Sequence, residues 1–133
     1  MNTHIRDCIA LILLCGHPEV SVAADPIPAD AQKAIAAVHS AATKRDFQAL
    51  KALMVQQFTW SFGYGGDSSS DLAIASWKTD PETVAALIRV TAGRCGSISE
   101  QYIQCPQDAD MSYRAGFRQT PTGWQLAYFL AGD

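Results

Sequence analysis

Two runs of alternating apolar and polar residues, joined by a tight turn, most strongly constrain the fold of this chain. The first run predicts a strand with an apolar face, formed by Met111, Tyr113, Ala115 and Phe117. The opposite face carries two arginines and is formed by Ser112, Arg114, Gly116 and Arg118. Thr120-Pro-Thr-Gly123 has proline and glycine where a tight turn favours them. A second strand follows over residues 124–130, and because both of its faces are apolar we expect it to lie centrally in the sheet.

Two helices are predicted near the start of the domain, before Phe58, because apolar residues recur there with helical spacing. Asp30 is placed to cap a helix that runs to about Thr43, and Asp46 to cap one that ends near Val55. Helices first and strands after predict a single α+β domain over residues 25–133. In this domain, N-terminal helices pack on a curved antiparallel sheet formed mainly by the C-terminal third.

The middle of the chain alternates between strand and helix. The run from Phe58 to Phe62 predicts a strand with one aromatic face, and a short helix is expected to end near Trp77. The next helix has stronger signals, with Asp80 as its N-cap, Pro81 at its first position and Gly93 as its terminator.

The glycine-rich loop over residues 63–71 has some features of a ligand-binding loop. A dinucleotide-binding loop needs a third glycine where Ser68 stands. A helix-loop-helix calcium site needs a glycine and a carboxylate where Leu72 and Lys78 stand, which leaves only an irregular calcium site open. We therefore predict no cofactor and no metal, and interpret the loop as a connection whose exit is capped by Ser69 or Ser70.

The first 24 residues have the features of a secretory signal peptide. A short polar lead precedes an apolar run over residues 8–15, which is too short to span a bilayer. Small residues at positions 22–24 favour cleavage before Asp25 and export to the periplasm or the medium. A lipoprotein signal would place Cys15 at the new N-terminus, but the bulky Leu14 before it disfavours that alternative.

Two cysteines, Cys95 and Cys105, remain after the predicted cleavage. In an oxidising compartment such a pair most often forms a disulfide, and the short separation then requires the chain to turn near residues 99–101. Two free cysteines remain an alternative. A reactive thiol is a third, although it needs a base and the one histidine after the leader, His39, is distant in the sequence.

The charge of the chain bears on its partners. The formal net charge is −3 at pH 7, and removal of Arg6, Asp7 and Glu19 with the leader brings it to −2. No basic patch appears, so we expect neither nucleic acid nor an anionic membrane as a partner. A small ligand, a protein partner or a second copy of the chain is compatible with this composition.

Two segments resemble the cone-shaped superfamily named after nuclear transport factor two, which includes polyketide-cyclase-like and ketosteroid-isomerase-like proteins. They are the run over residues 45–54 leading to Phe58-Thr-Trp60, and Gly123-Trp-Gln-Leu-Ala-Tyr-Phe129. The resemblance implies a conical pocket between the sheet and the helices. It does not imply catalysis, because many members of the superfamily only bind or dimerise.

Candidate ligand or partner residues follow from the aromatic pattern and from the one histidine of the domain. His39 borders the apolar stripe of the first helix, where it either looks into the cone or bonds to solvent or backbone at the boundary. The aromatic candidates, whose alternative role is simple core packing, are Trp60, Tyr64, Trp77, Tyr102 and Tyr113.

The first functional hypothesis is an exported, non-catalytic domain that binds a small apolar ligand or a protein partner, because no set of catalytic residues can be named together. A periplasmic immunity or inhibitor protein that uses the loop over residues 63–71 is an alternative. An isomerase- or cyclase-like enzyme that uses His39 or a carboxylate in the pocket is another.

Overall fold

The computed structural model describes Gly16 and residues 26–60 and 68–132 of the chain. Within these residues it contains, in order, α1 (Ala29–Thr43), α2 (Phe47–Ala52), β1 (Met54–Thr59), α3 (Ser70–Trp77), α4 (Pro81–Thr91), β2 (Gly96–Ser97), β3 (Tyr102–Cys105), β4 (Arg114–Thr120) and β5 (Gly123–Leu130). The predicted signal peptide, Tyr64 and most of the glycine-rich loop lie outside the described residues.

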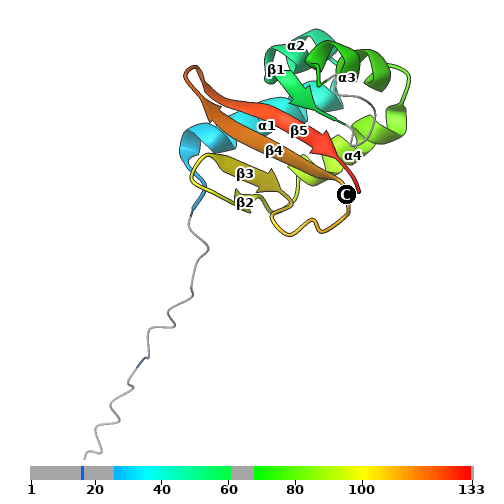
Figure 1. Cartoon of the computed structure of the whole chain (residues 1–133). Helices are drawn as coiled ribbons and strands as arrows, with labels where there is room; N and C mark the ends of the chain where they lie inside the picture. Colours follow the sequence, from blue (N-terminus) through cyan, green and yellow to red (C-terminus); the bar gives the residue numbers. More distant parts are fainter. Residues whose placement is uncertain (1–15, 17–25, 61–67, 133) are drawn as a thin grey trace, which may run out of the picture.

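The strands form one sheet in the order β1-β5-β4-β3-β2. Strands β2 to β5 pair with one another in antiparallel fashion, as predicted. β1 pairs with β5 in parallel, so the whole sheet is mixed and not purely antiparallel. Figure 1 shows α1 and α4 crossing behind β4 and β5, with α2 and α3 beside β1. The predicted α+β arrangement of helices on a sheet built mainly from the C-terminal third is confirmed.

The core lies between the helices and the covered face of the sheet. Its largest fully buried side chains come from both layers: Leu50, Phe58, Leu87, Ile103, Phe117, Leu126 and Phe129. The predicted central position of the last strand is confirmed, because β5 lies between β1 and β4. Among the described helices, none combines the length and the apolar character needed to cross a membrane.

Four helix caps were predicted, and two of them form side-chain hydrogen bonds as expected. Ser69 lies at the N-cap position of α3, as predicted, but its side chain makes no capping hydrogen bond. Asp46 accepts a hydrogen bond of 3.0 Å from the backbone N–H of Ala49, and Asp80 caps α4 as predicted. The prediction for Asp30 was wrong, because α1 begins at Ala29 with Pro28 at the N-cap position. The helix begins two residues earlier than predicted, after Pro28, whose ring fixes its φ near the helical value. Asp30 then lies in the first turn, where the helix dipole favours a carboxylate.

The second helix ends sooner than the sequence predicted. α2 stops at Ala52, and Met54 already belongs to β1. The backbone N–H of Leu126 donates to the carbonyl of Leu53 at 2.9 Å, and Met54 is paired with Leu126 in β5. Pairing with a neighbouring strand therefore prevails over the helical propensity of this stretch.

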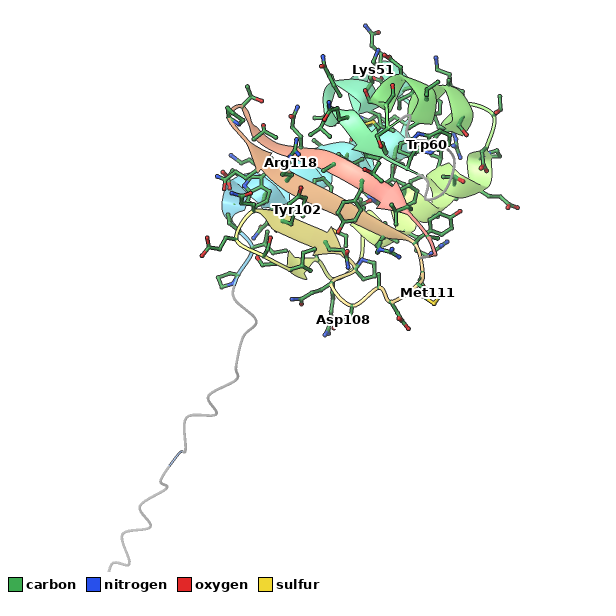
Figure 2. All side chains as sticks on the ribbon, viewed as in Figure 1. Lys51, Trp60, Tyr102, Asp108, Met111 and Arg118 are labelled. Carbon is green, nitrogen blue, oxygen red and sulfur yellow. A yellow bond between two sulfur atoms is a disulfide. The ribbon has the colours of Figure 1, made fainter. Side chains whose placement is uncertain are left out.

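The strand predicted from Met111 begins later in the structure. β4 starts at Arg114, while Met111 is 57% exposed and lies in the preceding loop. The backbone carbonyl of Met111 accepts a hydrogen bond of 2.8 Å from the N–H of Gly132. Ala115 and Phe117 are buried as expected for the apolar face. Figure 2 shows Arg118 and its register partner Tyr102 on the face of the sheet turned away from α1 and α4.

Both predicted turns in the C-terminal third are present. β2 and β3 form an antiparallel pair, and the disulfide between Cys95 and Cys105 closes it with the two Cα atoms 4.2 Å apart. In the second turn Thr120 pairs with Gly123. The φ of Gly123 is +115°, a value that glycine adopts more readily than residues with a side chain.

Candidate functional site

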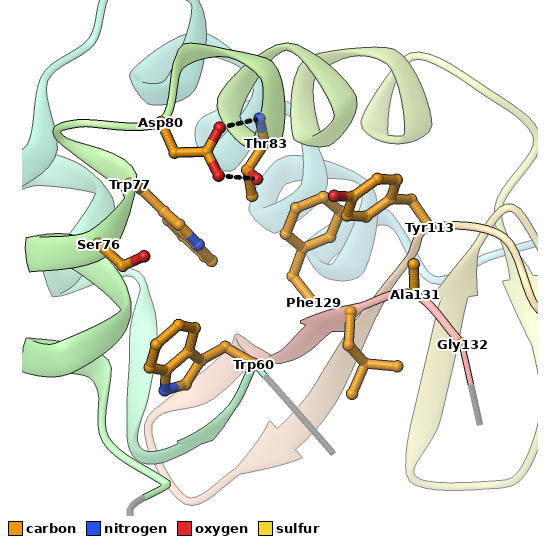
Figure 3. Close-up of a pocket in the computed structure, with 10 residues that line it drawn as sticks. Trp60, Ser76, Trp77, Asp80, Thr83, Tyr113, Phe129, Ala131 and Gly132 are labelled. Carbon is orange, nitrogen blue, oxygen red and sulfur yellow. Dashed lines mark hydrogen bonds between the residues drawn. The ribbon is translucent and has the colours of Figure 1, made fainter. Parts of the chain in front are cut away.

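Three of the predicted aromatic residues, Trp60, Trp77 and Tyr113, line one cavity of about 310 Å³. We call it the aromatic cavity. Its other walls are Ser76, Asp80, Thr83 and residues 129–132 at the end of β5. Figure 3 shows the side chains from α3 and the start of α4 facing those from β5 and the segment before β4 across this space. The sheet and the helices thus meet at the cavity.

The aromatic rings pack against one another in defined geometries. Trp77 is buried and meets Phe58 and Phe129 edge to face, with ring centroids 5.6 and 5.7 Å apart. Tyr113 stacks on Phe129 at 5.2 Å with an interplanar angle of 20°. Trp60 and Tyr113 are only partly buried. Trp77 and Phe129 therefore form the rigid base of the cavity, and Trp60 and Tyr113 form its accessible walls.

Asp80 brings a carboxylate to the wall of the aromatic cavity. One oxygen accepts from the Thr83 N–H at 3.2 Å and the other from the Thr83 hydroxyl at 2.6 Å. The hydroxyl and the backbone N–H of Thr83 together lower the pKa of Asp80 below its ordinary value. Asp80 is consequently ionised at neutral pH and held in one orientation.

His39 belongs to α1 and contacts α4. It lines a second cavity of about 350 Å³ with Ile35, Thr91 and Cys95. Its Nδ1 is 3.1 Å from the carbonyl oxygen of Ile88 and 3.0 Å from the hydroxyl oxygen of Thr91. The carbonyl can only accept, and the Thr91 hydroxyl donates to the Leu87 carbonyl. These contacts assign the hydrogen of the neutral ring to Nδ1.

Of the two remaining candidates, the structure describes Tyr102, which lines neither of these cavities. Tyr102 lies on the face of the sheet opposite the helices, paired with Arg118. Tyr64 is outside the described residues. In residues 26–60 and 68–132, no group of three His, Cys, Asp or Glu side chains is arranged to hold a metal ion.

Sequence reasoning did not assign Asp80, Ser76 or Phe129 to a ligand site. Asp80 was identified from its neighbour Pro81, but only as a helix cap. Its proximity to Trp60 and Tyr113 depends on how α3, α4 and β5 pack together, for which the local sequence has no signal.

Known proteins were compared with the chain by sequence and by structure. No protein-family model and no curated protein matches the sequence. An NTF-2-like protein of unknown function from Shewanella oneidensis MR-1 is similar in structure, with 12% identity and a TM-score of 0.49 over 78% of this chain and 97% of that one. An NTF2-like protein with a cystatin-like fold from Novosphingobium aromaticivorans has 17% identity and a TM-score of 0.44 over 74% of this chain and 76% of that one. Both are described as members of the superfamily that the sequence resembles, and the likeness concerns the fold alone.

Proposed function

We propose that the protein is an exported, non-catalytic domain that binds a small organic molecule in the aromatic cavity. The observation that carries the proposal is the convergence of Trp60, Trp77 and Tyr113, from three separate segments, on one cavity of about 310 Å³. Ligand sites are concave and are lined mainly by apolar and aromatic groups, with a few polar groups that fix orientation. Ser76 and Asp80 would have that orienting role here.

The state of Asp80 favours binding over acid–base catalysis. An efficient general acid or base has a pKa near the working pH, whereas hydrogen bonds from Thr83 lower the pKa of Asp80. Both of its oxygens also stabilise the start of α4. His39, the other candidate for an isomerase- or cyclase-like reaction, lines the other cavity.

Export is supported by two independent features. The leader has the pattern of a secretory signal, and Cys95 and Cys105 lie at bonding distance in the folded domain. Disulfides persist mainly in oxidising compartments, such as the periplasm or the extracellular medium. The alternative of a protein partner, as in an immunity protein, rests on the loop over residues 63–71, most of which lies outside the described residues.

A fluorescence titration tests the proposed function. The purified protein is titrated with a panel of small ring-containing compounds while the emission of its three tryptophans is recorded. We expect a saturable change for at least one compound, and a dissociation constant raised by about tenfold or more in Trp60→Ala, a loss of roughly 1.4 kcal/mol. Trp124→Phe is the matched control, because Trp124 does not line the cavity.

Two outcomes of this titration would contradict the proposed function. If no compound gives a saturable change, the aromatic cavity is not a ligand site. If Trp60→Ala and Trp124→Phe alter the affinity equally, the ligand binds elsewhere on the protein.

A further inference from the structure

We infer that the ligand of the aromatic cavity carries a cationic ammonium group, held between the carboxylate of Asp80 and the aromatic rings. This inference rests on the proposed function and specifies the chemical class of the ligand. It follows from the charge of the cavity wall, from the hydrogen-bonding capacity of Asp80 and from the aromatic side chains around it.

Among the ten described residues that line the cavity, Asp80 is the one with a formally charged side chain. Lys78, the nearest cation in the sequence, is exposed and is absent from the lining. Lys51 pairs with Asp71, and neither of these two residues is among the described residues that line the cavity. Arg114 is not a lining residue, and its guanidinium donates to the carbonyl of Gly132 at 2.9 Å. Among the described residues that line the cavity, none carries a positive charge that neutralises Asp80.

The carboxylate of Asp80 retains the capacity to bind a ligand. Thr83 donates one hydrogen bond to each oxygen, and the backbone N–H of Glu82 also interacts with the carboxylate. The two oxygens together have four lone pairs, so at least one lone pair stays available for a ligand. The N-terminus of α4 contributes about half a positive charge, which offsets only part of the full negative charge of Asp80. An ammonium group that reaches Asp80 thus gains both an ionic contact and a charge-assisted hydrogen bond.

The aromatic side chains favour the same class of ligand. The face of a tryptophan or tyrosine ring attracts a cation through its quadrupole, most strongly where water is excluded. In Figure 3, Trp77 lies beside Asp80, with Trp60 below it and Tyr113 on the opposite wall. A cation in this space has aromatic groups on both sides and a carboxylate at one end. A neutral apolar molecule would leave Asp80 without a charged partner.

A pair of isosteric probes tests the inference. Benzylammonium and ethylbenzene have nearly the same shape and differ in one heavy atom, an ammonium nitrogen that can donate hydrogen bonds in place of a methyl carbon. Each is titrated into the purified protein by tryptophan fluorescence. We expect the cation to bind at least about tenfold more tightly than the hydrocarbon, which is within the range of cation–π and ionic contacts combined.

Asp80→Asn separates charge from structure, because asparagine is also a favourable N-cap. We expect this variant to remain folded by circular dichroism and to lose the preference for the cation. Asp71→Asn is the matched control, since Asp71 also lies in the first turn of a helix but outside the cavity, and it should retain the preference. The wild-type comparison of the two probes holds even if Asp80→Asn unfolds.

The outcomes distinguish this inference from the proposed function. Equal or tighter binding of the hydrocarbon overturns the cationic ligand and leaves a neutral ligand in the cavity. A preference for the cation that survives in Asp80→Asn also overturns it. Failure of both probes to bind overturns it, and failure of the wider panel of ring compounds in addition overturns the proposed function itself.

Discussion

The hydroxyl of Tyr128 donates a hydrogen bond of 2.5 Å to Oε1 of Gln104, across the strand that separates them. The residue between them in register is Gly116, and a Cβ atom built there would come within 1.9 Å of the Tyr128 ring. The side-chain amide of Gln104 is fixed in turn, because its nitrogen donates to the carbonyl of Gln107 at 3.0 Å. Glycine at position 116 therefore allows the tyrosine to link β5 to β3 over β4.

This arrangement predicts that Gly116→Ala destabilises the protein by about 1–3 kcal/mol, the usual cost of overpacking. The ring of Tyr128 must move to admit a methyl group, and its hydrogen bond to Gln104 is then lost. Urea unfolding measures the change. In a Tyr128→Ala background the same substitution should cost no more than about 0.5 kcal/mol, because the clash is gone. An equal cost in both backgrounds would show that Gly116 acts through its backbone instead.

The same tyrosine should make stability depend on alkaline pH. Burial raises the pKa of Tyr128, an effect that Arg114 opposes and Tyr102 reinforces. The folded state thus binds the phenolic proton more tightly than the unfolded state does. Its contribution is complete below the ordinary tyrosine pKa of about 10 and is lost as the pH rises above that value. We expect the urea midpoint to fall less between pH 8 and pH 11 in Tyr128→Phe than in the wild type.

Phe117 and Met111 belong to one alternating run, but the structure predicts opposite sensitivities. Phe117 is fully buried, so Phe117→Ala should cost about 3–5 kcal/mol through lost burial and a cavity. Met111 is 57% exposed, and Met111→Ala should change the free energy of unfolding by no more than about 0.5 kcal/mol. Comparable costs for both substitutions in denaturant unfolding would place Met111 in the core and contradict the observed start of β4.

The disulfide should stabilise the domain by limiting the unfolded chain. Cys95 and Cys105 are 10 residues apart, and closing a loop of that size is worth roughly 2–3 kcal/mol in the chain-entropy model. We expect a reducing agent to lower the urea midpoint of the wild type and to leave that of a Cys95→Ala/Cys105→Ala variant unchanged. Two titratable thiols in the unreduced native protein would show that the bond is absent.

The predicted leader can be tested without reference to the fold. When the full chain is produced in a host that exports it, the mature protein should begin at Asp25, as measured by intact mass. Ala24→Lys removes the small residue before the cut and should block this processing. A mass that retains residues 1–24 in the wild type would exclude cleavage at this position.

Local chemistry explains which features the sequence determined by itself. Asp46 and Asp80 were identified as caps because an N-cap bonds to backbone groups only a few residues away. The turn at Pro121 and Gly123 follows from backbone preferences of those residues. The link between Cys95 and Cys105 follows from their being the two cysteines after the leader, and the turn between them from their short separation. Each of these interactions is contained in a short segment, so its residues alone predict it.

Contacts between distant segments decided the rest. The start of β1 at Met54 depends on pairing with Leu126, and Met111 is excluded from β4 although the alternation includes it. The aromatic cavity likewise joins Trp60, Asp80 and Tyr113, which no periodicity relates. Backbone pairing and packing between layers outweigh local propensity at these places, because they bury more apolar surface and satisfy more hydrogen bonds. The sequence by itself thus determined the elements and most of their ends, and the tertiary structure determined which side chains share a site.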